Sequence, residues 1–303
     1  MTKVAIYDSG VGGLSIYQAL REACPQFEYL FVSDNQAYPY GTKAEDELLE
    51  RVLNVSERII QQASPDILVL ACNTASTVCL PSLRARYKIA VVGVVPAIKP
   101  AAQISRSKVI GLLATPATIN RPYTESLIDQ FAPMCTVTRV GSTDLVDLAE
   151  AKLQGLPVEL SKLQDILEPF LSTPNLDTLA LACTHFPLLK DEISAVFESA
   201  AKPLVLIDSG LAIAKRVESL VADLVDDSVD DSVGGLVDDS VNDAINDSAD
   251  RFAEAQAKTA SKSQATDSLA GENIAMFTSQ VRSAKFIQNL KALGFCQIQL
   301  LNA

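Results

Sequence analysis

The sequence lacks the features on which several classes of protein depend. Its 303 residues include one histidine, His185, and no Cys-x-x-C pair, so we expect no zinc site. No apolar run approaches the ~18 residues that a membrane span requires, and no basic stripe indicates binding to nucleic acid. The chain starts directly in a strand pattern, so we expect no signal peptide. Six cysteines without framework spacing favour free thiols in the cytoplasm.

The negative charge is concentrated in one segment. The formal net charge is −12, but residues 222–250 contain ten aspartates and no Lys, Arg or Glu, so the rest of the chain sums to only −2. Such a composition is typical of a solvated segment, and we predict an acidic low-complexity insert over residues 222–273, disordered or partly helical. An arm that binds cations or a partner is the alternative interpretation.

Short apolar runs alternate with helical patterns along the remaining chain. Runs of this length, bounded by turn signals, are typical of buried parallel strands, so we predict an α/β fold. The expected strands are residues 4–7, 28–32, 67–71, 90–95, 109–114, 136–140, the run before Cys183, 204–207, 274–278 and 297–301. The pattern restarts near residue 109, which indicates a duplicated unit. We predict a first α/β domain of residues 1–97, 208–221 and 274–303, and a second of residues 98–207.

Two cysteines occupy equivalent places in the two sets of strands. Ala71-Cys72-Asn73-Thr74 and Ala182-Cys183-Thr184-His185 each follow an apolar run, at the strand ends where open α/β folds bind ligands. The start of a following helix would stabilise a thiolate. The two thiols would serve as a disulfide, as nucleophile and resolver, or as a pair of proton carriers. The residues alone leave these alternatives open.

A glycine-rich turn, Asp8-Ser9-Gly10-Val11-Gly12-Gly13, follows the first strand. Its order differs from both phosphate-binding patterns, and a carboxylate would repel phosphate. Asp8 suits an ammonium group or a role beside a thiol, and a capping turn is the alternative. A second Asp-Ser-Gly, at residues 208–210, we interpret as structural.

Short polar side chains accompany the two cysteines. His185 stands two residues after Cys183, where an imidazole can act as a proton shuttle. Hydroxyl and amide groups at strand ends can hold carboxylate oxygens without a full positive charge, although each could instead cap a helix. These residues are Asn73, Thr74, Thr115, Thr118 and Thr184.

Taken together and in order, these strings resemble the glutamate racemases of the aspartate/glutamate racemase superfamily. The matching strings are Asp8-Ser9-Gly10-x-Gly12-Gly13, Tyr38-Pro39-Tyr40-Gly41, residues 71–76, Thr115-Pro116-Ala117-Thr118, residues 183–187 and Asp208-Ser209-Gly210. The resemblance covers about residues 1–220 and 274–303. It implies two pseudo-symmetric domains, each an open parallel sheet flanked by helices, with the active site in the cleft between them. It also implies a cofactor-independent isomerase that interconverts L- and D-glutamate and supplies D-glutamate for peptidoglycan.

The resemblance assigns roles to individual residues. Cys72 would take the α-proton from D-glutamate and Cys183 from L-glutamate, each assisted by a neighbour, Asp8 or His185. Two groups suit the reaction, because a single base tends to return the proton to the same face. We expect the substrate contacts to come from Asp8, Ser9, Tyr40, Gly41, Asn73, Thr74, Thr115, Thr118, Thr184 and His185.

The chain departs from the family pattern at Ala182, where a glycine is common, and in the acidic insert. A racemase for aspartate or another acidic amino acid is the nearest alternative, although Thr184-His185 favours glutamate. A cysteine hydrolase or amidotransferase would leave one thiol without a purpose, and a binding protein would act through the acidic arm. The expected partner is glutamate. A homodimer and regulation by a cell-wall precursor are compatible with the resemblance, but the sequence decides neither.

Overall fold

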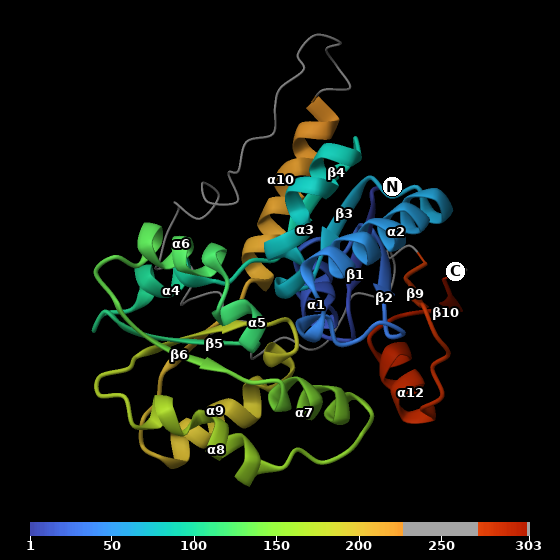
Figure 1. Ribbon diagram of the computed structural model, residues 1–303. Coiled ribbons are helices and arrows are strands. Elements are labelled where there is room, and N and C mark those ends of the chain that lie inside the picture. Colours follow the sequence, from blue (N-terminus) through green and yellow to red (C-terminus); the bar gives the residue numbers. More distant parts are fainter. Residues whose placement is uncertain (227–271, 302–303) are drawn as a thin grey trace.

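The chain folds into two lobes, each built on a parallel β-sheet. The computed structural model describes residues 1–226 and 272–301. Figure 1 shows the blue, teal, orange and red elements in one lobe and the green and yellow elements in the other. The α/β class and the presence of two parallel sheets flanked by helices are as predicted. The exact division into domains stays a prediction.

Six parallel strands of the described chain form the first sheet, in the order β10-β9-β2-β1-β3-β4. The strands are β1 (Lys3–Asp8), β2 (Glu28–Ser33), β3 (Ile67–Leu70), β4 (Ala90–Gly93), β9 (Ile274–Phe277) and β10 (Gln297–Leu300). Asp8 is in register with Ser33, and Tyr7 with Leu70. The carboxyl ends of the central strands therefore meet at one edge, which is where parallel sheets place ligands.

Four parallel strands of the described residues form the second sheet, in the order β6-β5-β7-β8. They are β5 (Val109–Ala114), β6 (Thr136–Gly141), β7 (Thr178–Ala182) and β8 (Val205–Ile207). Ala114 is in register with Ala182, so the segments after β5 and β7 leave the sheet side by side. Both predicted cysteine motifs thus follow central strands of their sheets.

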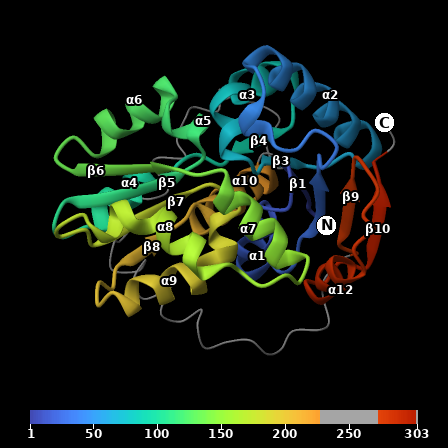
Figure 2. The same cartoon turned by 60° about the horizontal axis from the view of Figure 1, so that its bottom comes forward.

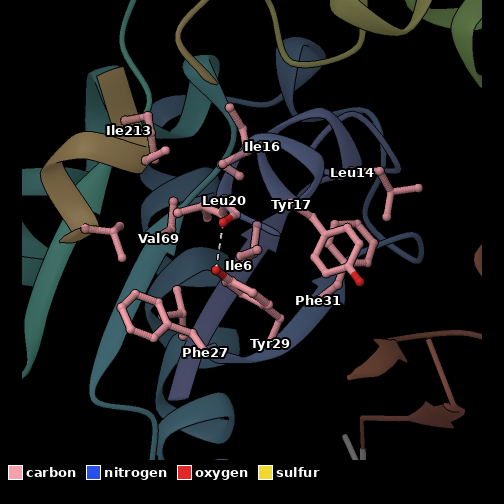
Figure 3. Packing of buried hydrophobic residues seen from close by; sticks show 14 of the residues in the cluster. Ile6, Leu14, Ile16, Tyr17, Leu20, Phe27, Tyr29, Phe31, Val69 and Ile213 are labelled. Atoms are coloured by element: carbon pink, nitrogen blue, oxygen red, sulfur yellow. Dashed lines mark hydrogen bonds between the residues drawn. The ribbon is translucent and has the colours of Figure 1, made fainter. Parts of the chain in front are cut away.

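Alternating side chains of the first sheet enter two separate cores. One core contains Ile6 and Val69 under α1 (Leu14–Ala23), α10 (Gly210–Asp226) and α12 (Ala284–Ala292). Figure 3 shows this packing, with the Tyr29 hydroxyl donating to the Leu20 carbonyl at 2.9 Å. The other core contains Ala5 and Leu68 under α2 (Glu45–Ala63) and α3 (Asn73–Arg86). Successive side chains of a strand point to opposite faces, so the apolar residues of each strand pack into the cores on both faces of the sheet.

Helix α2 illustrates why these segments are helical. Its buried residues Leu48, Val52, Val55 and Ile59 recur every three or four positions, which places them on one face. Three acidic residues in the first turn compensate the helix dipole. The helix therefore covers the sheet with an apolar stripe and presents its charged side outward.

The second sheet is likewise covered on both faces. One face packs against α4 (Ile98–Ile104) and α6 (Pro122–Phe131). The other packs against α7 (Asp144–Leu153), α8 (Leu160–Leu171) and α9 (Lys190–Ser199). Figure 2 shows α7 next to α1, where the two lobes meet. Three short helices, η1 (Tyr40–Thr42), α5 (Pro116–Ile119) and η2 (Phe186–Leu189), follow strand ends near the same junction.

The predicted strands agree with the structure to within two residues at each end. The largest difference is β4, which ends at Gly93 rather than Val95. Helix α10 extends to Asp226 and so enters the acidic segment. Residues 227–271 of the predicted insert lie outside the described residues. Asn273, at the end of that predicted range, is buried and its Oδ1 accepts the N–H of Tyr29 at 3.1 Å, so this residue is part of the first lobe. Within the described parts of the chain, no helix has both the length and the apolar character needed to cross a membrane.

Candidate active site

A cavity of about 170 Å³ lies where the edges of the two sheets face each other, and both motif cysteines line it. Its walls come from both lobes. The lining residues are Ser9, Tyr38, Pro39, Tyr40, Gly41, Thr42, Cys72, Asn73, Thr74, Thr115, Thr143, Val146, Asp147, Cys183, Thr184 and His185. A larger cavity of about 590 Å³ lies beyond Tyr38 and Glu150, and neither motif cysteine lines it.

Of the residues predicted from the sequence, ten line the small cavity and two lie behind it. The ten are Ser9, Tyr40, Gly41, Cys72, Asn73, Thr74, Thr115, Cys183, Thr184 and His185. Asp8 and Thr118 are completely buried and do not line the cavity. All six cysteines of the chain are free, so Cys72 and Cys183 do not form a disulfide.

Cys72 is the N-cap residue of α3, as expected from its position after β3. Burial raises the pKa of the Cys72 thiol, and the negative charge of Asp8 raises it further. The backbone N–H of Ala75 and the Ser9 hydroxyl, whose oxygen is 3.7 Å from Sγ, act in the opposite direction. The helix start therefore favours a thiolate at Cys72, as expected, but burial outweighs this contribution to the pKa.

Asp8 lies beneath the first thiol at the end of β1. Its Oδ2 accepts the N–H of Gly13 at 2.9 Å and that of Gly10 at 3.4 Å, which holds the glycine-rich turn. Its Oδ1 has no hydrogen-bond partner within the described chain. Burial raises the pKa of Asp8, against the effect of the positive charge of His185. The hydrogen bonds therefore agree with the capping-turn interpretation of this aspartate, and its role beside the thiol stays a prediction.

His185 lies beside the second thiol. Its Nδ1 is 3.8 Å from Cys183 Sγ, and its Nε2 is 2.9 Å from Oε1 of Glu150 on α7. Burial alone would lower the pKa of His185, but the hydrogen bonds with Cys183 and Glu150 raise it well above its usual value. Cys183 is followed by the short helix η2 rather than directly by an α-helix. The imidazole is therefore a charged neighbour of this sulfur.

Three threonine hydroxyls form a cluster that joins the two lobes. Thr74 Oγ1, at the start of α3, is 3.2 Å from that of Thr115 and 3.3 Å from that of Thr118. The Oγ1 atoms of Thr115 and Thr118 are 3.0 Å apart. The Thr115 side chain also caps α5 by accepting the backbone N–H of Thr118. Nearby, the Asn73 Nδ2 has no partner among the described residues. These groups provide hydrogen-bond donors and acceptors without a formal charge.

Gly12 permits the close approach of the two lobes. A Cβ atom at this position would lie 2.4 Å from His185 Nδ1 and 2.6 Å from Thr184 Oγ1, closer than any side chain allows. Ser15, the second residue of α1, donates to the carbonyl of Thr184 at 2.8 Å. The loop after β1 thus packs directly on the second cysteine motif.

Several residues around the site were not predicted from the sequence. Glu150 binds both His185 and the backbone of Val11, yet an acidic residue within an amphipathic helix gives no signal in the sequence. Asp34 accepts hydrogen bonds from Tyr40 and Arg51. The position of Asp34 directly after the strand that ends at Ser33 is the sequence signal that could have identified it as a site residue. The described residues contain no cluster of three or more His, Cys, Asp or Glu side chains suited to a metal ion.

The fold and the paired cysteines define the class of the protein. The family model for Asp/Glu/hydantoin racemases matches residues 12–217, and the chain belongs to this family. A glutamate racemase from Vibrio cholerae is 51% identical over 219 residues, which cover 72% of this chain and 80% of the relative. A glutamate racemase from Pectobacterium atrosepticum is 49% identical over 221 residues, which cover 73% of this chain and 76% of the relative.

The solved structures give the same assignment. The crystal structure of Escherichia coli glutamate racemase, in complex with L-glutamate and the activator UDP-MurNAc-ala, matches with a TM-score of 0.79 at 36% identity. The match covers 99% of this chain and 97% of that one. The chain is therefore an isomerase, and the resemblance seen in the sequence motifs is confirmed.

Proposed function

We propose that the protein is a cofactor-independent glutamate racemase that interconverts L- and D-glutamate with Cys72 and Cys183 as the two acid/base groups. The observation that supports it best is that thiols from opposite lobes line one cavity. A substrate bound between them would present one face of Cα to each sulfur. Inversion requires removal of a proton on one face and delivery on the other, so a single cavity between two thiols suits this reaction.

The charges around the cavity favour one starting state. Burial and Asp8 keep Cys72 a neutral thiol, and the raised pKa of His185 keeps an imidazolium beside Cys183. An imidazolium is a favourable counter-ion for a thiolate. In this state, Cys183 would take the α-proton of L-glutamate while the S–H of Cys72 delivers its proton to the opposite face. The product is D-glutamate, with Cys72 then the thiolate and Cys183 the thiol.

The remaining predicted residues would hold the substrate. The hydroxyls of Ser9, Thr74, Thr115 and Thr184 and the amide of Asn73 would bind the carboxylate oxygens, and the turn with Tyr40 and Gly41 would form one wall. Thr118 would act through Thr115, and a direct contact between Asp8 and the substrate stays a prediction. Preorganised donors of this kind stabilise a carbanion-like state without a cofactor.

The wider role follows from the product. We infer that the D-glutamate supplies peptidoglycan synthesis in the cytoplasm. The first domain would comprise residues 1–97, 208–221 and 274–303, and the second residues 98–207. The Escherichia coli relative was solved with the activator UDP-MurNAc-ala, so a peptidoglycan precursor is the first regulator to test on this chain. A homodimer also stays a prediction.

The decisive experiment is incubation of the purified protein with L-glutamate in D₂O without pyridoxal phosphate. We expect D-glutamate that carries deuterium at Cα, detected by chiral chromatography and NMR. L-Aspartate, tested in parallel, distinguishes the nearest alternative. Turnover of aspartate without turnover of glutamate would overturn the substrate assignment, and release of ammonia from an amide would indicate a hydrolase.

A further inference from the structure

Asp34 is a buried carboxylate behind the wall of the small cavity, and four hydrogen bonds hold it. It follows β2, and none of its surface is exposed. Arg51 on α2 donates to both carboxylate oxygens, from Nε at 2.8 Å and from Nη2 at 2.6 Å. Tyr40 donates its hydroxyl at 2.6 Å, and Thr278, just after β9, donates at 2.7 Å. Donors from three separate segments of the chain therefore fix this carboxylate.

Tyr40 connects Asp34 to the cavity. Its side chain is only 1% exposed, whereas its neighbours Gly41 and Thr42 are more open and line the cavity with it. Tyr40 uses its one hydroxyl proton on Asp34, so in the contact between the Tyr7 and Tyr40 hydroxyls the donor is Tyr7. Tyr40 is thus the buried anchor of η1, and Asp34 sets the direction of its hydroxyl.

Arg51 determines the charge of Asp34. Burial alone would raise the pKa of Asp34, but the hydrogen bonds from Arg51, Tyr40 and Thr278 lower it below its ordinary value. The titratable and charged groups that face Asp34 are Arg51 from α2, Tyr40 from η1 and Tyr7 from β1, whereas Thr278 from the end of β9 is neutral. Without Arg51, burial would dominate, and Asp34 would take up a proton at a higher pH.

We propose that Arg51 is a positioning residue of the racemase, which acts through Asp34 to fix Tyr40 and the turn that forms one wall of the glutamate site. The inference rests on the proposed function. Arg51 itself does not line the cavity. Thr278 acts on the same carboxylate from the C-terminal part of the chain, so two distant segments hold one turn in place.

Two substitutions of Arg51 test this role. Arg51→Met removes the charge and both hydrogen bonds to Asp34, whereas Arg51→Lys keeps the charge but cannot form the bidentate pair of hydrogen bonds. We expect Arg51→Met to raise KM for both enantiomers and to lower kcat/KM by about 10- to 100-fold, with Arg51→Lys between it and the wild type. The matched control is Arg86→Met, which breaks the exposed ion pair of Arg86 with Glu57, another residue of α2. It should leave KM unchanged.

The pH dependence separates positioning through Asp34 from a simple packing defect. In Arg51→Met the pKa of Asp34 in the folded protein would be raised, so stability is lost as the pH rises through it. The difference in Tm from the wild type should therefore widen as the pH rises above the ordinary pKa of an aspartate, and the ratio of KM values should change over the same range. A packing defect would give a constant difference and a constant ratio.

The outcomes are distinguishable. A wild-type KM and a constant Tm difference in Arg51→Met would overturn the inference while the wild-type enzyme still racemises glutamate. If the wild type racemises nothing, the proposed function fails, and the Tm measurements alone decide whether Arg51 controls Asp34. If Arg51→Met does not fold, Thr278→Val removes one donor to the same carboxylate and should raise KM about 2- to 10-fold. An unchanged KM in Thr278→Val would then overturn the inference.

Discussion

Nε2 of His185 lies 2.9 Å from Oε1 of Glu150, and this contact ties the imidazole to the junction of the two lobes. The same carboxylate oxygen accepts the backbone N–H of Val11, from the loop after β1, at 3.0 Å. The other ring nitrogen faces Cys183. One glutamate side chain therefore links the charge of the histidine beside the second thiol to the packing of the first lobe against it.

Alanine at either motif cysteine should abolish racemisation, with a loss of at least about 100-fold in kcat. Cys183→Ala retains Cys72 and should exchange the α-proton of D-glutamate alone, whereas Cys72→Ala should exchange that of L-glutamate alone. ¹H NMR of each enantiomer in D₂O measures this difference. Cys296→Ser, at an exposed cysteine remote from the cavity, is the control. Full turnover by either alanine variant would refute the two-base assignment.

Asp8→Asn should change the two directions of the reaction unequally. The negative charge of Asp8 contributes to the raised pKa of Cys72, so its removal should lower that pKa. The part of the pH–rate profile that depends on Cys72 deprotonation, measured with D-glutamate, should move to lower pH. The profile with L-glutamate should change less. Equal displacement of both profiles would contradict a local effect of Asp8 on Cys72.

Glu150→Gln should lower the pKa of His185, because the carboxylate contributes to its raised value. The chain contains one histidine, so its imidazole resonances in an NMR titration need no further assignment. In the wild type the ring should remain protonated above neutral pH, and in Glu150→Gln the midpoint should move down. Glu192→Gln, which alters a salt bridge of Lys152 on the same helix, should leave the midpoint unchanged. Identical titration midpoints in the wild type and Glu150→Gln would contradict the claim that Glu150 raises the pKa of His185.

Gly12→Ala should disturb the junction between the lobes. The added Cβ would overlap the Thr184 and His185 positions, and overpacking of this kind costs about 1–3 kcal/mol. We expect lower stability to urea together with a fall in kcat/KM. Ser15→Ala removes the neighbouring hydrogen bond to Thr184 without adding volume and should cost about 1 kcal/mol at most. A Gly12→Ala enzyme as active and stable as the wild type would show that close packing of the loop after β1 on Thr184 and His185 is not required.

The sequence predicted the strands well because fully buried parallel strands are short apolar runs with clear ends. Two aspartates that precede such runs show how much local information these ends contain. Asp66 accepts the backbone N–H of Lys3 at 2.7 Å, and Asp177 accepts those of Arg106 and Ser107 at 2.8 and 2.7 Å. Each joins the start of its strand to a neighbouring segment of the same lobe.

The site was only partly predictable, because its supporting residues come from helices whose sequence shows only amphipathicity. Glu150 and Arg51 look like ordinary charged residues on solvated helix faces, and only the packing of the chain brings them to His185 and Asp34. The raised pKa of the Cys72 thiol was also not predicted, because it results mainly from burial, and the extent of burial depends on contacts from both lobes. Motifs next to strand ends were found, and long-range partners were not.

The order of the strands has a consequence for biosynthesis. The second sheet is built from one continuous stretch of chain, whereas the first is completed by β9 and β10, the last of the described strands to leave the ribosome. The nascent chain must therefore hold an unfinished sheet edge at β2 while the other lobe is made. A premature stop before residue 274 would spare both thiols but leave that edge bare, so the truncated product would be prone to aggregate.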